Sequence, residues 1–226
     1  MGQIPTGASD PYAIRRQCIG VIQILQTTGL QISLKSILDK GTTLYNIEGD
    51  SKDKIVTNVY TFMQNRIDHL LIEEGFSKDI VSAVTSISID NIGEVKSKVE
   101  VLQQLTSKDD FEPLAIAFKR VVNIIKKADC PEEFDIDESL FEHDCESNLY
   151  NKFKDISDEV NSALDVSDFA TCLSKIASLK DSVDDFFDNA MVMVDDMKVR
   201  NNRLVLLTRI SDLFSNIADF SKITTK

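Results

Sequence analysis

Glycine and proline are almost absent from the second half of this sequence. The last glycine is Gly93 and the last proline is Pro131, so residues 132–226 contain neither. Both residue types interrupt regular elements, and a long stretch without them is typical of helices joined by tight polar turns. Strand-like alternation and internal repeats are also lacking. The sequence therefore predicts an all-α fold, an irregular bundle of about eight to ten helices.

Long apolar runs are missing as well. No run is long enough to cross a membrane, and the start of the chain lacks the pattern of a signal peptide. The four cysteines are widely separated and form no C-x-x-C pair, so we expect free thiols in a reducing compartment. These features predict a cytoplasmic protein with no membrane partner.

Basic residues are fewer than acidic residues in this sequence. The chain has 25 Lys and Arg residues against 37 Asp and Glu residues, a formal net charge of −12. General nucleic-acid binding depends on neutralising phosphates, so this balance argues against it, and we expect no DNA partner. A local group of cations on an acidic protein remains compatible with RNA binding, so such a site must be sought where Lys and Arg gather.

Residue types that carry catalysis are also few. There are two histidines, His69 and His143, and no phosphate-binding loop, dinucleotide motif or nucleophile elbow. The run His143-Asp144-Cys145 holds three possible metal ligands, but neighbours on a helix point about 100° apart and do not converge on one ion. A small metal-dependent hydrolase would need His69 and His143 to meet in space. We expect no catalytic residues and no metal site.

Helix signals recur along the chain. Capping residues and helix-ending glycines predict helices over Asp10–Gly29, Ser33–Asp39 (ended by Gly41), Ser51–Gly75, and from Ser77, Asn91, Ser107, Asp137 and Ser167, the last running to Phe187. The third has a broad apolar stripe, predicted to face inward: Ile55, Val59, Phe62, Met63, Ile67, Leu70 and Leu71. The polar loop Thr42–Asp50 is the predicted domain boundary.

The stretch from Phe186 to Phe220 has the strongest pattern. Its second part carries an apolar stripe at spacings of three and four: Leu206, Ile210, Leu213, Ile217 and Phe220. Asp195 or Asp196 is predicted to cap this last helix. The preceding run Ala190–Val194 is apolar at every position, and we expect the rest of the chain to cover it on all sides.

Two arginines of the last helix stand out. On a helical wheel, Arg203 falls near the centre of the apolar stripe and Arg200 at its edge. A guanidinium in such a stripe must be paired or must reach water. One interpretation is an ion pair of Arg203 with an acid near the start of the helix: Asp188, Asp195 or Asp196. The other is contact of these arginines with an RNA loop, because guanidinium groups pair with phosphates and stack on unpaired bases.

A second group of cations lies within the helix Ser107–Lys127. Lys119 and Lys126 are seven residues apart, as are Arg120 and Lys127, so each pair shares a face and forms a basic strip about two turns long. A solvated face and an RNA contact are both consistent with this spacing.

Several of these segments resemble the bacterial glycyl-tRNA synthetase β subunit. That protein ends in a helical anticodon-binding domain of the DALR type. The resemblance is carried by PTGASDPYAIRRQ, PLAIAFKRVVNI, FFDNAMVMVDD, Asn202-Arg203-Leu204 and IADFSKI. Where the motif name expects Ala-Leu-Arg, this chain has Lys198-Val199-Arg200, which keeps the arginine and not the alanine.

The resemblance implies a C-terminal fragment with the tail of a body domain over 1–48 and a helical region over 49–226, whose anticodon-binding core begins near 107. It implies part of an ATP-dependent ligase that attaches glycine to tRNA. The implied partners are a glycine-accepting tRNA and the synthetase α subunit, with ATP bound outside this chain and no cofactor in it. The implied tRNA-binding residues are Lys119, Arg120, Lys126, Lys198, Arg200 and Arg203. The alternative is a helical protein–protein interaction scaffold without RNA binding.

Overall fold

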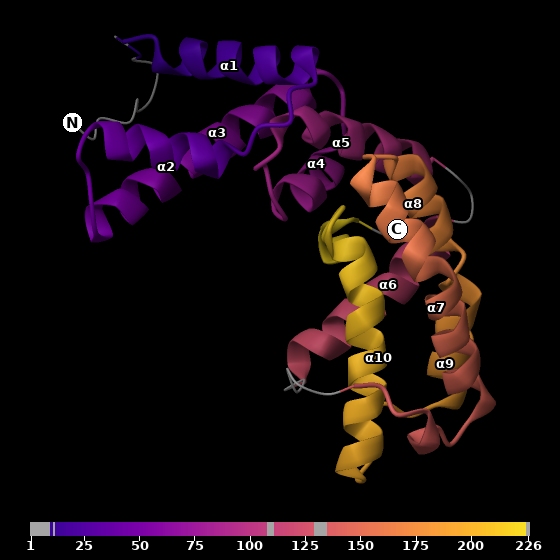
Figure 1. Cartoon of the computed structure of the whole chain (residues 1–226). Helices are drawn as coiled ribbons and strands as arrows, with labels where there is room; N and C mark the ends of the chain where they lie inside the picture. Colours follow the sequence, from indigo (N-terminus) through magenta and orange to yellow (C-terminus); the bar gives the residue numbers. More distant parts are fainter. Residues whose placement is uncertain (1–9, 11, 108–110, 129–134, 225–226) are drawn as a thin grey trace. The chain divides into compact units, whose positions relative to one another are not determined.

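A computed structural model describes residues 10, 12–107, 111–128 and 135–224 (Figure 1). Over those residues the regular elements are helices, and the one β contact is an isolated bridge between Ser33 and Asn91. The predicted all-α fold is therefore confirmed. None of the helices in the described ranges is long and apolar enough to span a bilayer. The chain divides into two compact units, Met1–Glu100 and Val101–Lys226.

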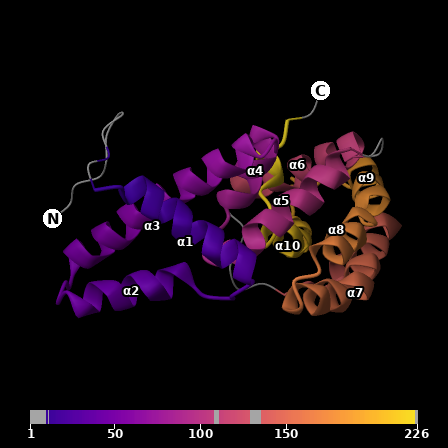
Figure 2. The same ribbon diagram turned by 90° about the horizontal axis from the view of Figure 1, so that it is seen from above.

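The first unit is built around one long helix. Its elements are α1 Ile14–Thr28, α2 Leu34–Leu44, α3 Asp50–Glu73, α4 Lys78–Thr85 and the first part of α5 Ile92–Thr106. Helix α3 packs against both α1 and α2. It is drawn between them in Figure 1, and Figure 2 shows the same three helices from above. The start of α2 is tied to the chain before α5, because the amide of Leu34 donates to the carbonyl of Asp90 at 2.8 Å. The Asp90 carboxylate accepts from the amide of Lys35 at 2.7 Å.

The first helix ends where the sequence predicts but starts later: Asp10 was predicted to cap a helix beginning at the next residue, whereas α1 begins at Ile14, after Ala13 in a left-handed conformation with φ of +55°. The carboxylate of Asp10 accepts hydrogen bonds from the amides of Ile14 and Arg15 at 2.8 and 3.1 Å. Gly29 ends the helix with φ of +63°, a conformation that glycine adopts without a Cβ penalty. Pro11, the other part of the predicted start signal, lies outside the described residues.

The predicted bounds of the next two helices were wrong at one end each, whereas the cap of α2 at Ser33 and the end of α3 before Gly75 were right. Helix α2 passes through Gly41 and ends at Leu44. An interior glycine costs a helix only about 1 kcal/mol, and α2 packs against α3. Helix α3 begins at Asp50, so Ser51 is not its cap. Gly49 precedes it with φ of +63° and ψ of −154°, a backbone conformation open to glycine and strained for serine.

The apolar stripe of α3 is only partly buried. Met63, Ile67 and Leu71 are buried, whereas Ile55 and Val59 are 38% and 36% exposed. The buried residues recur every four positions and form one narrow line along the helix. The prediction of a broad inward face was therefore wrong for the first three turns, where the neighbouring helices leave Ile55 and Val59 partly uncovered.

The second unit contains the shorter helices and the last long one. Its elements after α5 are α6 Phe111–Lys127, η1 Glu138–Leu140, α7 Asp144–Asp165, α8 Phe169–Ala177, α9 Lys180–Asn189, α10 Met197–Ser215 and η2 Phe220–Lys222. Helix α10 packs against α6, α7 and α8 (Figure 1). Three rings fill the contact between α6 and the C-terminal elements. Phe118 stacks on Phe214 at 4.8 Å and meets Phe220 edge-on at 5.4 Å.

Two helices predicted as continuous are broken. Asp137 caps only η1, where its carboxylate accepts from the amide of Ser139, and α7 begins separately at Asp144. Likewise α8 ends at Ala177 and α9 begins at Lys180. At this second break the amide of Leu179 bonds three residues back to the carbonyl of Ile176, which tightens the turn and buries Leu179.

The caps of α8 and α10 were predicted with mixed success. Asp168, and not Ser167, caps α8, because its carboxylate accepts from the amide of Thr171 at 3.1 Å. Asp196 caps α10 by accepting from the amides of Lys198 and Val199, which selects one of the two predicted acids. The division into residues 1–48 and 49–226, with a core from about 107, stays a prediction.

Candidate nucleic-acid interface

Arg203 is buried in the second unit and fully engaged there. It is 1% exposed, and Glu146, which faces it, is 0% exposed. Its Nε donates to Glu146 Oε1 at 2.8 Å and its Nη2 to Glu146 Oε2 at 3.0 Å, a paired fork that suits a carboxylate. Nη2 also reaches Glu142 at 2.9 Å, and Nη1 donates to the carbonyl of Met191 at 2.9 Å. Every guanidinium nitrogen therefore has a protein partner.

The acidic partner of Arg203 was expected, but its identity was predicted wrongly. Asp188, Asp195 and Asp196 were the candidates because they are near in sequence, whereas Glu142 and Glu146 precede Arg203 by 61 and 57 residues. Glu146 could be selected only once α7 was known to start at Asp144. Its Oε2 accepts from the amides of Glu142 and His143 at 2.9 and 3.0 Å, so the same carboxylate also caps α7.

These contacts set the protonation state of the pair. Burial alone would raise the pKa of the Glu146 carboxyl group. The hydrogen bonds from Arg203 and from the amides of Glu142 and His143, together with the charge of Arg203, outweigh burial and hold that pKa below its ordinary value. The hydrogen bonds that Arg203 donates to Glu146 raise the pKa of Arg203. The pair is therefore ionised at neutral pH.

The lowered pKa of Glu146 predicts a stability term that is lost in acid. An unfolded glutamate titrates near pH ~4.3. A group whose pKa is lower when folded stabilises the protein above that value, and this contribution is lost as the pH falls through the folded pKa. We expect the free energy of unfolding, measured with urea, to fall below about pH 4. The fall should be shallower in Glu146→Gln, and parallel pH profiles for the two proteins would contradict this assignment.

Two arginines donate hydrogen bonds to backbone carbonyl groups of the connection between α9 and α10. Arg203 bonds to the carbonyl of Met191, and Arg200 Nε donates to the carbonyl of Val194 at 2.9 Å. The expectation of cover on all sides was wrong, because the connection is extended at Ala190 and its side chains alternate. Ala190 and Val192 are buried, whereas Met191 and Met193 are 71% and 53% exposed.

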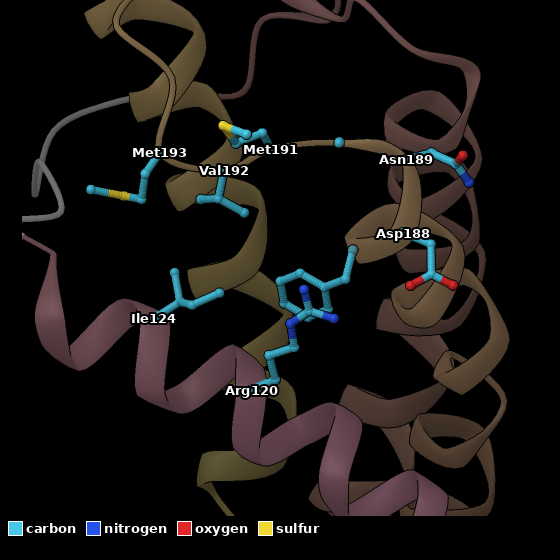
Figure 3. Close-up of a pocket in the computed structure, with 9 residues that line it drawn as sticks. Arg120, Ile124, Asp188, Asn189, Met191, Val192 and Met193 are labelled. Atoms are coloured by element: carbon cyan, nitrogen blue, oxygen red, sulfur yellow. The ribbon is translucent and has the colours of Figure 1, made fainter.

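An open hollow lies beside this connection. Its volume is about 490 Å³, and it is lined by Arg120 and Ile124 of α6, by the end of α9 and by residues 191–193 (Figure 3). Arg120 extends from α6 into this space, with Asp188 and Asn189 on one side and Met191 and Met193 on the other (Figure 3). The guanidinium carbon of Arg120 lies 4.2 Å from the centre of the Phe187 ring. Phe187 was not singled out from the sequence, where it reads as one more apolar residue of a core stripe.

The other cations predicted to bind tRNA have different surroundings. Lys126 is exposed at the end of α6, where it pairs with Asp219 at 3.7 Å and donates to Ser221 at 3.2 Å. Lys119 is half-buried on the same helix. Lys198 is exposed on the first turn of α10, and Arg200 is half-buried two residues later. Two of these cations thus lie at the α9–α10 connection. Arg120 lines the hollow beside it, and the Arg200 side chain donates to its backbone carbonyl at Val194.

The two histidines do not form a metal centre with other described residues. Within the ranges that the structure covers, no group of three or more His, Cys, Asp and Glu side chains could hold a metal ion. His143 instead precedes α7, where its amide donates to Glu146. His69 is exposed on α3 in the first unit. The metal-dependent hydrolase hypothesis therefore has no supporting cluster.

Comparison with known proteins assigns both parts of the chain. A model of the glycyl-tRNA synthetase beta subunit matches residues 1–86, and a model of the DALR anticodon binding domain matches residues 114–226. The glycine–tRNA ligase beta subunit of Desulfatibacillum aliphaticivorans is 44% identical over 232 residues, which cover 99% of this chain. That of Desulforapulum autotrophicum is 40% identical over 97% of this chain, and that of Geotalea daltonii is 41% identical over 99%.

The chain spans about a third of the length of these relatives, 32% in each case. The two family models meet different parts of the structure: the first covers α1 to α4, and the second covers nearly all of α6 and everything after it. The Arg203 network and the hollow beside the α9–α10 connection both lie within the second match. The chain belongs to the glycyl-tRNA synthetase β subunit family, and residues 114–226 are its DALR anticodon binding domain.

Proposed function

We propose that the second unit binds the anticodon end of a glycine-accepting tRNA. The observation that carries this proposal is the DALR anticodon binding domain match, which covers the residues that form the hollow and hold its rim. The exposed cations of this unit provide a physical basis, because local positive charge allows an acidic protein to bind phosphate. The interaction-scaffold hypothesis has no comparable observation in its favour.

We assign different roles in RNA binding to the individual cations. Arg120, Lys126 and Lys198 are exposed and are proposed to meet the RNA directly. Lys119 and Arg200 are half-buried and are proposed to contact it at the edge of the same surface. Arg203 is assigned an indirect part, because its guanidinium is buried and bonded to Glu142, Glu146 and Met191.

The wider enzyme supplies the chemistry in this proposal. The relatives are named as beta subunits of glycine–tRNA ligase and are about three times as long as this chain. We propose that ATP and glycine are bound and activated elsewhere in the assembly, with the α subunit as partner, and that this chain contributes tRNA recognition in the cytoplasm. No catalytic role is assigned to its own residues.

Direct binding measurements test the proposal. The chain is titrated against a glycine-accepting tRNA and against a tRNA for another amino acid at several salt concentrations. We expect tighter binding of the glycine tRNA, with an affinity that falls as salt rises because phosphate contacts release counterions. Equal affinity for both tRNAs, or no binding of either at low salt, would remove the support for anticodon recognition.

Arg200→Ala should weaken tRNA binding with little effect on folding. The loss should be about 1–3 kcal/mol if Arg200 pairs with or stacks on a base, and less if it only neutralises a phosphate. If Arg200 only neutralises a phosphate, the slope of the logarithm of the affinity against the logarithm of the salt concentration should become shallower by about one unit. Loss of its hydrogen bond to Val194 should cost about 1 kcal/mol of stability. Arg209→Ala removes the same charge from an exposed position of α10. Equal tRNA affinity in both variants would exclude Arg200 from the interface.

A further inference from the structure

We infer that the hollow beside the α9–α10 connection binds one unpaired RNA base, stacked on the guanidinium of Arg120. The inference rests on the proposed function and specifies the ligand group, its position and the residues that hold it. It makes a planar base, and not only the phosphate backbone, the group recognised at this place.

The first argument is the orientation of Arg120. This side chain is exposed, yet its guanidinium lies over the ring of Phe187 at 4.2 Å, and Phe187 itself is buried. The guanidinium is therefore held against a ring of the protein while the group still lines the hollow. A guanidinium held in this way loses less rotamer freedom when a second flat ring stacks on it, and arginine planes are common stacking partners of unpaired bases.

The second argument is the exposed methionine rim. Met191 and Met193 are large apolar side chains on the connection that Arg200 and Arg203 hold by its carbonyl groups. The two methionine side chains are therefore exposed on a segment whose backbone is fixed by hydrogen bonds. The methionine side chain is polarisable and adaptable, so it can pack against the face or edge of different aromatic rings. These thioethers and Arg120 line opposite parts of the hollow (Figure 3).

The third argument is the distribution of polar groups around the space. Asp188 and Asn189 line one side, where their side-chain oxygens can accept hydrogen bonds from the edge of a base. The amide nitrogen of Asn189 already donates to Asp185. Lys127 lies two helical turns beyond Arg120 on the same face of α6, about 10 Å away, and is exposed. A strand whose base enters the hollow can therefore place a neighbouring phosphate near this ammonium group. A volume of about 490 Å³, open to solvent, admits a base still attached to its chain.

Methionine methyl signals offer a direct test. The chain has five methionines, of which Met63 is buried in the first unit and Met197 is exposed outside the hollow. The protein is labelled with ¹³C at the methionine methyl groups, and Met191→Leu and Met193→Leu variants assign the two rim signals. The probes are a hairpin RNA with the anticodon stem and loop of a glycine tRNA, and the same hairpin with abasic loop residues.

We expect the intact hairpin to shift the signals of Met191 and Met193 through the ring current of the bound base, and to leave Met63 unmoved. The abasic hairpin should not produce these shifts. If the intact hairpin binds and both rim signals stay in place, or if the abasic hairpin shifts them equally, the base site is overturned while RNA binding by the unit stands. If no RNA binds at all, this inference and the proposed function both fail.

Substitutions of Arg120 separate stacking from charge. Arg120→Ala should weaken binding of the intact hairpin by about 5- to 150-fold, the range for loss of a base stack. Arg120→Lys keeps the charge but not the plane, so it should weaken binding by at least about fivefold without changing the salt dependence. Arg209→Lys is the matched control and should bind like the parent. Arg120→Lys with parental affinity would overturn the stacked base.

Discussion

Arg203→Ala is expected to lower the free energy of unfolding by about 3–5 kcal/mol. The substitution leaves the carboxyl group of Glu146, which is 0% exposed in the parent, without its cation, and removing one member of a buried pair costs more than the pair itself contributes. It also leaves the carbonyl of Met191 without its donor. Urea denaturation at neutral pH measures the loss.

A double substitution provides the control for this result. Replacing both members, as in Arg203→Met with Glu146→Leu, removes the buried charges together and should recover part of the loss. The recovery should be incomplete, because the amides of Glu142 and His143 lose the carboxylate that accepts from them. An Arg203→Ala variant that unfolds at the same urea concentration as the parent would show that the network contributes nothing to stability.

Phe118→Ala is expected to lower the free energy of unfolding by about 3–5 kcal/mol as well. The Phe118 ring is 0% exposed and contacts both Phe214 and Phe220, so its removal takes two aromatic contacts and leaves a cavity. The loss arises from packing and not from charge. It should therefore be insensitive to pH near neutrality and below, whereas the contribution of Glu146 is not.

A neighbouring residue on the same helix is the matched control. Ile116 of α6 is 52% exposed, so Ile116→Ala should change stability by no more than about 0.5 kcal/mol. Both variants keep the charges of α6 and are compared by urea unfolding with the parent. Similar losses for Phe118→Ala and Ile116→Ala would mean that the three-ring cluster does not anchor α6 to the C-terminal elements.

Local features of the fold could be predicted because their causes are local. The end of α1 at Gly29 and the cap of α10 at Asp196 depend on residues within one helical turn. The breaks before Asp144 and after Ala177 were missed because a helical wheel assumes a continuous helix. It does not show that the Glu146 carboxylate accepts from the amide of Glu142, or that the Ser178 hydroxyl donates to the carbonyl of Lys175. The exposed edge of the α3 stripe was missed because periodicity shows which side chains are apolar and not how many partners are available to cover them.

In the candidate site, too, the features with local causes could be predicted and those that depend on contacts between distant segments could not. Burial of Arg203 and its need for an acid follow from the apolar stripe alone, whereas the choice of Glu146 depends on how α7 and α10 pack. The cations of α6 were visible in the sequence, but the ring that orients Arg120 comes from α9, 67 positions later by residue number (187 − 120). Contacts between distant segments decide which of several similar cations is held in a defined orientation.

The Glu146–Arg203 network has a consequence for the dynamics of the α9–α10 connection. Segments of this kind usually open independently of the core at little cost in free energy. Here the Met191 carbonyl, the Arg203 guanidinium and the first turn of α7 share one set of hydrogen bonds, so the connection cannot leave its place without breaking a bond from the buried Arg203. We therefore expect the connection to unfold together with α7 and α10, and to present its surface to a ligand already ordered.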